Sequence, residues 1–342
     1  MGMRKVHQAL PLSSSTTMIG SLPHHNIDAA LEFSFRVGIP FLPQIPIRNP
    51  WEFMIAQALE GMPGLEIERD GSTSLNREVW EGRSKAFNQR LIQAFEKNDD
   101  PEAFTQFEPS SAASSCWQPF LWELSERKVK LAKIQIAGPI TCQWVLRTRE
   151  GEHTEKFSDI SAQIYRLVLA RALAMSRRLF LDGIQPLLFL DEPGLFALNP
   201  ANPKHLVSMQ ELKLMIQALK KEGVLVGLHC CSHTHWPSLF SLGLDVLSVD
   251  TAQSLGAIVG EESLLDAFLL GGGRLSLGVV PTTREAASEW DAQALYKSVG
   301  DYLGRNRLRE AILTPACGLA LHDAKDAETI LETLLEFQRL VD

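Results

Sequence analysis

The chain lacks the features that mark secreted, membrane-spanning and nucleic-acid-binding proteins. Its 342 residues contain five cysteines, an odd number without the spacing of a disulfide framework. No apolar run approaches the roughly eighteen residues of a membrane-spanning helix, and the opening residues contain no signal-peptide stretch. The net charge is −8, without a lysine- or arginine-rich segment, which excludes the electrostatic footprint for nucleic acid or an anionic membrane. We therefore expect a reduced, cytoplasmic protein that binds neither.

A glycine-rich dinucleotide fingerprint is also missing after the first apolar run. What the chain does contain is a series of eight short, continuously apolar runs, typical of strands buried on both faces. They cover residues 15–21, 38–45, 131–138, 186–191, 224–231, 245–250, 274–280 and 311–318. Helical patterns, such as the one over residues 158–183, separate several of these runs. This alternation predicts an α/β protein, a single (β/α)₈ TIM-barrel domain over residues 1–342.

One long stretch interrupts the alternation between the second and third predicted strands. Residues 51–130 include glycine-, proline- and serine-rich pieces, and they predict helices and a small hairpin over the barrel mouth. An insertion of this length is compatible with a lid over the site, and equally with an ornament or a dimer contact.

Three side chains that bind metals stand at the ends of predicted strands. His229 and Cys231 close one apolar run, and Cys317 closes the last one. One imidazole nitrogen and two thiolates suit a tetrahedral zinc ion. Alternate residues of a strand share a face, so Cys230 is expected to point away from this group and to pack in the core. The sequence thus predicts zinc on the three residues, with Asp250 or solvent as the fourth ligand.

Zinc held by two protein thiolates favours chemistry on sulfur. Coordination lowers the pKa of a substrate thiol, which is normally about 8.5, so the thiol binds as a thiolate at neutral pH. Zinc has no redox chemistry, and the two thiolates weaken its acidity towards water. This donor set therefore indicates transfer of a methyl group to a thiol.

Two adjacent carboxylates, Asp191 and Glu192, follow the fourth predicted strand, where barrel enzymes build their active sites. They are candidates for binding a cationic amine or for acid–base catalysis. Because Pro193 follows them, a helix N-terminus explains the same residues.

Other polar side chains lie in the loops after the first three predicted strands. Ser21 is a candidate for holding a substrate carboxylate, or for capping a helix. Gln44 and Trp144 are predicted to contact the substrate because they lie at the same end of the barrel.

At these motifs the sequence resembles the catalytic, carboxyl-terminal barrel of cobalamin-independent methionine synthase, within the wider uroporphyrinogen-decarboxylase-like superfamily. The resemblance covers nearly the whole chain, with gaps in the insertion. The matching pieces are Ile19-Gly20-Ser21 with Pro23, Arg48-Asn49, Gly138-Pro139-Ile140-Thr141, Leu190-Asp191-Glu192-Pro193, His229-x-Cys231, Asp250 through Ser254, and Cys317-Gly318-Leu319. It implies zinc on the His-Cys-Cys set, a substrate carboxylate near Ser21 and a substrate amine near Asp191.

The chain departs from the family pattern at several positions. Asp250 stands where the family has a glutamate, and residues 44–47 lack the glutamate that binds the amine of homocysteine. Residues 278–285 lack a histidine that the family has after the seventh strand. The length leaves no room for the additional amino-terminal barrel that helps the long members to hold folate. Shorter relatives take the methyl group from a methylated corrinoid.

The expected partners are thus a small thiol, homocysteine or another, and a methyl donor that is a methylated corrinoid or methylfolate. Two other readings stay open. One is an enzyme of the uroporphyrinogen-decarboxylase type, although such enzymes need arginine-rich contacts for several propionates. The other is a non-catalytic accessory protein that binds zinc or a corrinoid. The sequence does not set the oligomeric state.

Overall fold

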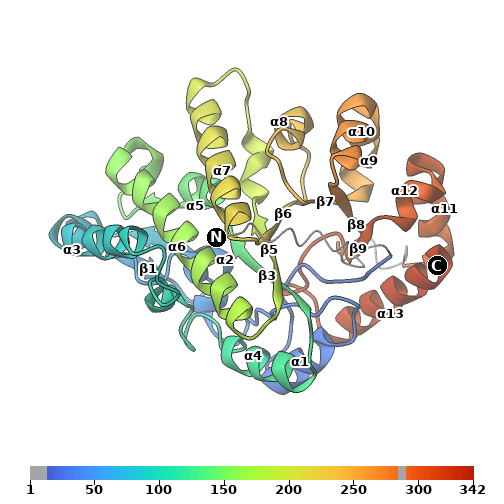
Figure 1. The fold of residues 1–342 in the computed structure, drawn as a ribbon, viewed down its shortest axis with the longest axis horizontal. Coiled ribbons are helices and arrows are strands. Elements are labelled where there is room, and N and C mark those ends of the chain that lie inside the picture. Colours follow the sequence, from blue (N-terminus) through green and yellow to red (C-terminus); the bar gives the residue numbers. More distant parts are fainter. Residues whose placement is uncertain (1–13, 284–289) are drawn as a thin grey trace.

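The structure is a computed structural model and describes residues 14–283 and 290–342. A parallel sheet with the order β3-β5-β6-β7-β8-β9 forms its centre and is curled, with helices around it (Figure 1). Its strands are β3 (Leu131–Ala137), β5 (Gln185–Asp191), β6 (Leu225–Cys230), β7 (Val246–Asp250), β8 (Arg274–Val280) and β9 (Ile312–Pro315). Each strand coincides with a predicted apolar run, except that β5 begins one residue earlier, at Gln185. The fold is therefore α/β, with a curled parallel sheet of six strands in the described ranges.

The first two predicted strands are extended segments and not regular strands, so the expectation of eight regular strands is only partly met. Pro40 and Pro43 remove backbone donors from the second segment, and Gly20 in the first has a φ of 146°. Both segments (blue in Figure 1) nevertheless run parallel to their neighbours. Isolated bridges join them to each other and to the two edges of the sheet, at Thr16–Leu313, Ser21–Gln44 and Phe41–Lys133.

Helices cover the outside of the sheet, as the alternation predicts for parallel strands. They are α1 (Ile27–Ser34), α5 (Pro139–Val145), α6 (Ser158–Leu181), α7 (Pro203–Lys221), α8 (Trp236–Phe240), α9 (Thr251–Gly260), α10 (Glu262–Leu270), α11 (Ala292–Leu303), α12 (Arg305–Arg309) and α13 (Ala324–Val341). Side-chain caps fix several of their starts: Asn26, Asn202, Asp250, Asp291 and Asp323 each accept a backbone N–H of the first turn. The caps therefore set where each connection from the sheet ends.

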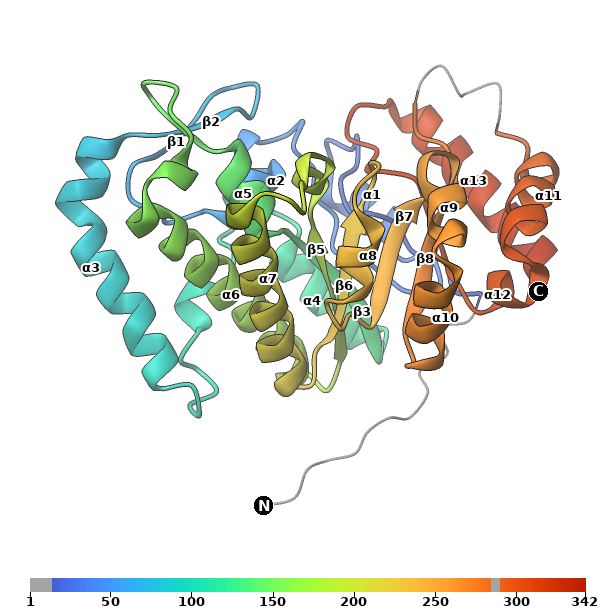
Figure 2. The same ribbon diagram turned by 90° about the horizontal axis from the view of Figure 1, so that it is seen from above.

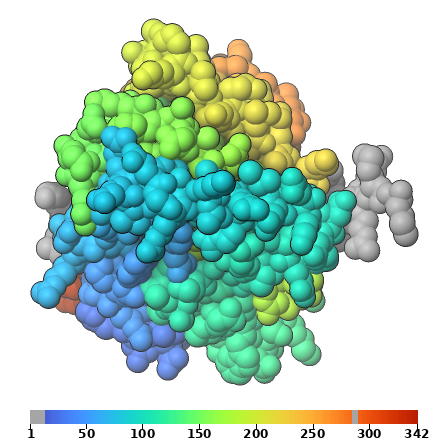
Figure 3. All heavy atoms as spheres, turned by 90° about the vertical axis from the view of Figure 1, so that its left-hand side faces the viewer, coloured from blue at the N-terminus to red at the C-terminus, as the bar shows by residue number. Residues whose placement is uncertain are grey.

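The insertion contains the predicted helices and hairpin. They are α2 (Met54–Ala58), β1 (Leu65–Ile67), β2 (Thr73–Leu75), α3 (Arg77–Glu96) and α4 (Trp117–Glu126). The antiparallel hairpin β1–β2 also pairs with β4 (Arg147–Thr148), which follows α5 at the carboxyl end of β3. Helix α3 packs against α6 on the side away from the sheet (Figure 2). In Figure 3 the cyan and blue-green atoms of this stretch lie across the middle and lower part of the face turned to the viewer.

Buried charges fasten the insertion to the rest of the fold. Arg171 of α6 is 2% exposed, and its Nη1 lies 2.9 Å from Oε2 of Glu60. The Glu60 carboxylate also accepts the backbone N–H of Ser110, so one ion pair links two parts of the insertion to α6. Glu52, 1% exposed, accepts the backbone N–H of Ile45 at 2.9 Å. The insertion is therefore fixed close to the second extended segment.

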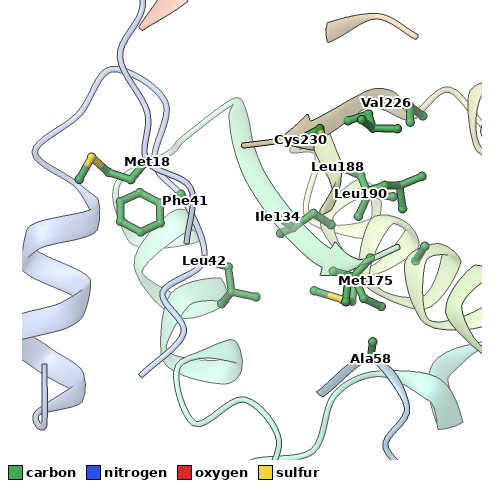
Figure 4. Close-up of a cluster of buried hydrophobic side chains, with 14 of the residues drawn as sticks. Met18, Phe41, Leu42, Ala58, Ile134, Met175, Leu188, Leu190, Val226 and Cys230 are labelled. Carbon is green, nitrogen blue, oxygen red and sulfur yellow. The ribbon is translucent and has the colours of Figure 1, made fainter. Parts of the chain in front are cut away.

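The main hydrophobic core lies between the sheet and its helices. Figure 4 shows part of it, with Leu188, Leu190 and Val226 of the sheet near Met175 of α6. Cys230 belongs to this cluster and is fully buried.

A second, smaller cluster consists of Ile39, Leu187, Phe189, Val246 and Ile312. Its members come from the second extended segment and from alternate strands of the sheet, as is typical of layers inside a barrel. Within the described ranges, no helix is both long enough and apolar enough to cross a membrane.

Candidate metal centre

The three predicted metal-binding residues lie together at the carboxyl ends of two strands. His229 is near the end of β6, Cys231 directly follows this strand, and Cys317 follows β9. Because β7 and β8 separate β6 from β9 in the sheet, only the curl of the sheet brings these residues together (Figure 1). One ligand atom from each residue lies within 4.8 Å of the others. A single ion therefore fits between one imidazole nitrogen and two sulfur atoms.

The imidazole of His229 has a fixed orientation. The side chain is 3% exposed, and its Nδ1 lies 3.0 Å from Oγ of Ser248 on the neighbouring strand β7. Its Nε2 is buried and has no hydrogen-bond partner among the described residues. A buried polar atom without a partner is costly, and histidine ligands are commonly oriented through their other ring nitrogen. The geometry thus fits a metal at Nε2.

The two cysteines of this group differ from the other three. Cys231 and Cys317 are partly exposed, whereas Cys116, Cys142 and Cys230 are buried. A hydrogen bond from the Cys317 thiol lowers the pKa of Cys231, and the same contact raises the pKa of Cys317. Burial raises the pKa of Cys230 to about 12, which keeps it a neutral thiol in the core. Only the accessible pair is therefore chemically suited to bind a metal.

Asp191 ends β5 and pairs in register with His229 of β6. Its side chain is only 7% exposed, and burial raises its pKa to about 6, although the ammonium of Lys133 opposes this shift. Its Oδ1 is buried without a partner among the residues described. A carboxylate in this state is suited to a cationic group of a ligand.

Glu192, predicted as a second catalytic carboxylate, has its oxygens occupied by protein groups. It is fully buried and accepts the backbone N–H groups of Ile140 and Thr141, at 3.0 and 2.6 Å, and the Thr141 hydroxyl at 2.6 Å. Burial raises its pKa to about 7. A Cβ at Gly138 would lie 2.1 Å from its Oε1. Glu192 therefore caps the start of α5, a different helix from the one that its sequence position predicts.

Asp250, predicted as a fourth metal ligand, is not among the residues that the structure brings together at the metal centre. Its Oδ1 accepts the N–H groups of Ala252 and Gln253, at 2.8 and 3.3 Å, and its Oδ2 accepts the Gln253 side chain at 3.0 Å. The short side chain folds back over the first turn of α9, which explains why it serves as a helix cap.

Of the residues predicted to contact the substrate, some lie beside the metal centre and others are engaged by protein groups elsewhere. Ser21 lies beside the metal centre: its carbonyl accepts the N–H of Leu319 at 2.8 Å, and a Cβ at Gly318 would lie 2.1 Å from its Oγ. Gln44 is buried and donates to Oε1 of Gln57 in the insertion.

Trp144, the remaining residue predicted to contact substrate, packs on the ring of His205 in α7, with 4.4 Å between the ring centroids. Of Ser21, Gln44 and Trp144, Ser21 alone is placed against a neighbour of Cys317.

Sequence reasoning missed three buried polar residues: Lys133 and Gln135 of β3, and Ser248 of β7. The sequence does contain a pattern that reveals such residues. Alternate residues of a strand point to the same face of the sheet, so polar residues at every second position indicate a polar face. In β3 the lysine and the glutamine are two residues apart within an otherwise apolar run. A prediction that counts the run as apolar on both faces does not reveal these two side chains.

Replacing Ser248 with alanine is expected to lower the affinity of the site for zinc about 10- to 100-fold, as is typical when a partner of a histidine ligand is lost. The physical reason is that His229 would lose the contact that fixes its ring and leaves Nε2 free for the metal. Competition with a chelating dye measures the affinity.

Ser276 provides a matched control for this variant. It is the residue of β8 in register with Ser248, and its hydroxyl is buried and has no partner in the described part of the chain. Ser276→Ala is therefore expected to leave zinc affinity within about two-fold of wild type. Equal affinities in all three proteins would show that Ser248 does not orient the ligand.

Comparison with known protein families and with curated proteins found no match. Among solved structures, the chain is similar to a B12-independent methionine synthase from Shewanella sp. W3-18-1, solved in complex with selenomethionine. The sequence identity is 14% and the TM-score is 0.45. The match covers 65% of this chain and 66% of that chain, which is just under two thirds of its length.

Proposed function

We propose that this protein is a zinc-dependent methyltransferase that moves a methyl group onto the sulfur of a small thiol. The observation that carries the proposal is the meeting of His229, Cys231 and Cys317, with all three ligand atoms within 4.8 Å of one another. Three protein ligands leave one tetrahedral position open, as in catalytic zinc sites. Zinc bound there would lower the pKa of a coordinated thiol and hold it as a thiolate.

The residues around this centre support a ligand with polar groups beyond its sulfur. Asp191 offers a buried carboxylate oxygen without a partner in the described ranges, and we propose that it binds the amine of an amino-acid thiol. Ser21, on the side of Cys317, would bind the carboxylate through its hydroxyl. Asp250 is engaged as a cap, which leaves the fourth metal position to the thiol or to solvent.

Glu192 has a supporting role in this proposal. Its oxygens accept three hydrogen bonds from the first turn of α5, so it holds that helix close to β5 and the neighbouring Asp191. It would orient the site without touching the substrate.

We further propose that the six strands and the two extended segments together act as one (β/α)₈ barrel. The parallel bridges at Thr16–Leu313, Ser21–Gln44 and Phe41–Lys133 support a closed ring. The insertion would then shield the mouth from its position beside the second extended segment. We propose that the methyl donor is a methylated corrinoid or methylfolate.

The test is methyl transfer by the zinc-loaded protein from methylcobalamin to homocysteine, with the methylated thiol quantified by mass spectrometry. We expect product that depends on protein and on zinc. Failure to bind zinc would overturn the proposal and would favour an enzyme of the decarboxylase type. Tight zinc binding without methyl transfer from either methylcobalamin or methylfolate would favour a non-catalytic accessory protein.

A further inference from the structure

Two polar side chains of β3 lie inside the curled sheet and have no place in the proposed chemistry. Lys133 is 1% exposed and Gln135 is fully buried. The ammonium of Lys133 donates to the carbonyl of Ile19 at 2.7 Å and to Oε1 of Gln135 at 3.0 Å. It also lies 4.8 Å from the ring centroid of Phe189. These partners are all neutral, and among the described residues the Lys133 ammonium forms no ion pair.

The two side chains hold the extended segments where regular strand pairing is missing. Gln135 donates through Nε2 to the carbonyl of Leu42 at 2.7 Å, and Lys133 reaches Ile19 in the other segment. Gly20 packs directly on Gln135, because a Cβ at this position would lie 2.4 Å from Nε2 of Gln135. Polar side chains of β3 thus support the turn that immediately precedes Ser21.

Ser21 is fixed from the opposite side by the loop that follows Cys317. Leu319 donates its N–H to the Ser21 carbonyl at 2.8 Å, and Gly318 leaves space for the Ser21 hydroxyl. On the next residue, Leu22 donates to the carbonyl of Gln44 at 2.8 Å. The position of Ser21 relative to Cys317 therefore depends on contacts on both sides of one irregular turn.

A buried lysine is a costly way to fill a core, since an ammonium loses its hydration there. Burial accordingly lowers the pKa of Lys133 to about 8, and the negative charge of Asp191 opposes that shift. A methionine would fill nearly the same space without that cost. The lysine is therefore better explained by its hydrogen bond to Ile19 and by its positive charge than by packing.

We infer that Lys133, together with Gln135, positions the Gly20–Ser21 turn beside Cys317, so that a ligand whose sulfur is at the metal centre can place its carboxylate on Ser21. This inference rests on the proposed function for the identity of the ligand. It assigns Lys133 an effect on the recognition of the carboxylate and none on the binding of the metal.

The first experiment uses the metal-free protein and needs no ligand. Hydrogen exchange is compared between wild type, Lys133→Met and Lys130→Met, an exposed lysine just before β3 that serves as the control. In Lys133→Met the amides of Leu22 and Leu319 are expected to exchange at least about ten-fold faster, as expected from the loss of a charged hydrogen bond. Amides of β6 and β7 should be unchanged.

The second experiment measures binding to the zinc-loaded proteins by calorimetry. Mercaptobutanoate carries a thiol and a carboxylate, and propanethiol carries the thiol alone. Lys133→Met is expected to weaken mercaptobutanoate about ten-fold and propanethiol less than about two-fold, with zinc affinity unchanged. Lys130→Met should match wild type. If the wild-type protein binds neither zinc nor a thiol, the proposed function fails, while hydrogen exchange still decides the role of Lys133.

Three outcomes would overturn the inference: unchanged exchange at Leu22 and Leu319, faster exchange throughout the sheet, or equal weakening of both thiols. The last two would assign Lys133 to general stability. If Lys133→Met does not fold, Gln135→Met removes only the neutral partner of the pair. It is expected to give the same pattern with smaller changes.

Discussion

Replacing Cys317 with alanine is expected to lower zinc affinity by more than about 100-fold, because a direct ligand contributes more than the 10- to 100-fold typical of its hydrogen-bonded partners. The variant would keep His229 and Cys231, two donors at the carboxyl end of β6, and would lose the donor that follows β9. Metal content after dialysis against a chelator measures the loss. In the wild type, X-ray absorption should give Zn–S distances of about 2.3 Å and a Zn–N distance of about 2.0–2.1 Å.

Cys230→Ala is the matched control, because it removes a thiol next to the site without removing a ligand. Cys230 lies in the apolar cluster of Figure 4, and burial keeps its thiol neutral. This variant should retain the full zinc content. If both variants retained zinc equally, or if Cys230→Ala lost it, the assignment of the ligands would be wrong.

Replacing Asp191 with asparagine is expected to weaken homocysteine binding about 10- to 100-fold, which corresponds to a lost charge-assisted hydrogen bond of about 1.5–3 kcal/mol. Asparagine keeps the shape of the side chain and removes the charge. Residues 44–47 contain no carboxylate, so the predicted site offers the amine no second anion there. For this reason we also expect wild-type protein to bind homocysteine only weakly, or to prefer a thiol without the amine.

Calorimetry on the zinc-loaded proteins tests this prediction, with mercaptobutanoate as the matched ligand that lacks the amine. The variant should bind mercaptobutanoate at least as well as wild type. The pKa of Asp191 is raised to about 6, so the carboxyl of the wild type becomes neutral as the pH falls through that value. The difference between the two proteins should accordingly disappear at lower pH. Tight homocysteine binding that is the same in both proteins would show that the amine binds elsewhere.

The sequence predicted the regular strands and the faces of their side chains, because both depend on the pattern of apolar residues along the chain. The six regular strands follow from continuous apolar runs, because parallel strands are buried on both faces. The carboxyl ends of such strands lie at one edge, and therefore residues as distant in sequence as Cys231 and Cys317 were expected to meet. The opposite placement of Cys230 follows from the two-residue period of a strand.

The sequence did not predict which hydrogen-bond partner a polar side chain would take when several are within reach. Asp250 closes a strand in the expected place, yet nearby N–H groups of α9 engage its carboxylate. The same holds for Glu192, which caps α5, the helix after the neighbouring strand β3, and not the helical turn that follows Glu192 itself. The first two strands were predicted as regular because apolar content does not record the missing N–H groups of Pro40 and Pro43.

The close approach of Ser21 to Gly318 constrains how this protein can diverge during evolution. Any side chain at position 318 would meet the Ser21 hydroxyl, and any side chain at position 138 would meet the Glu192 carboxylate. A mutation at either glycine is therefore tolerated only after the contacting residue has changed. The two residues of each pair, Gly318 with Ser21 and Gly138 with Glu192, are expected to coevolve. Ser21 and Gly318 lie far apart in the sequence, and selection on the site thus couples two distant segments of the chain in inheritance.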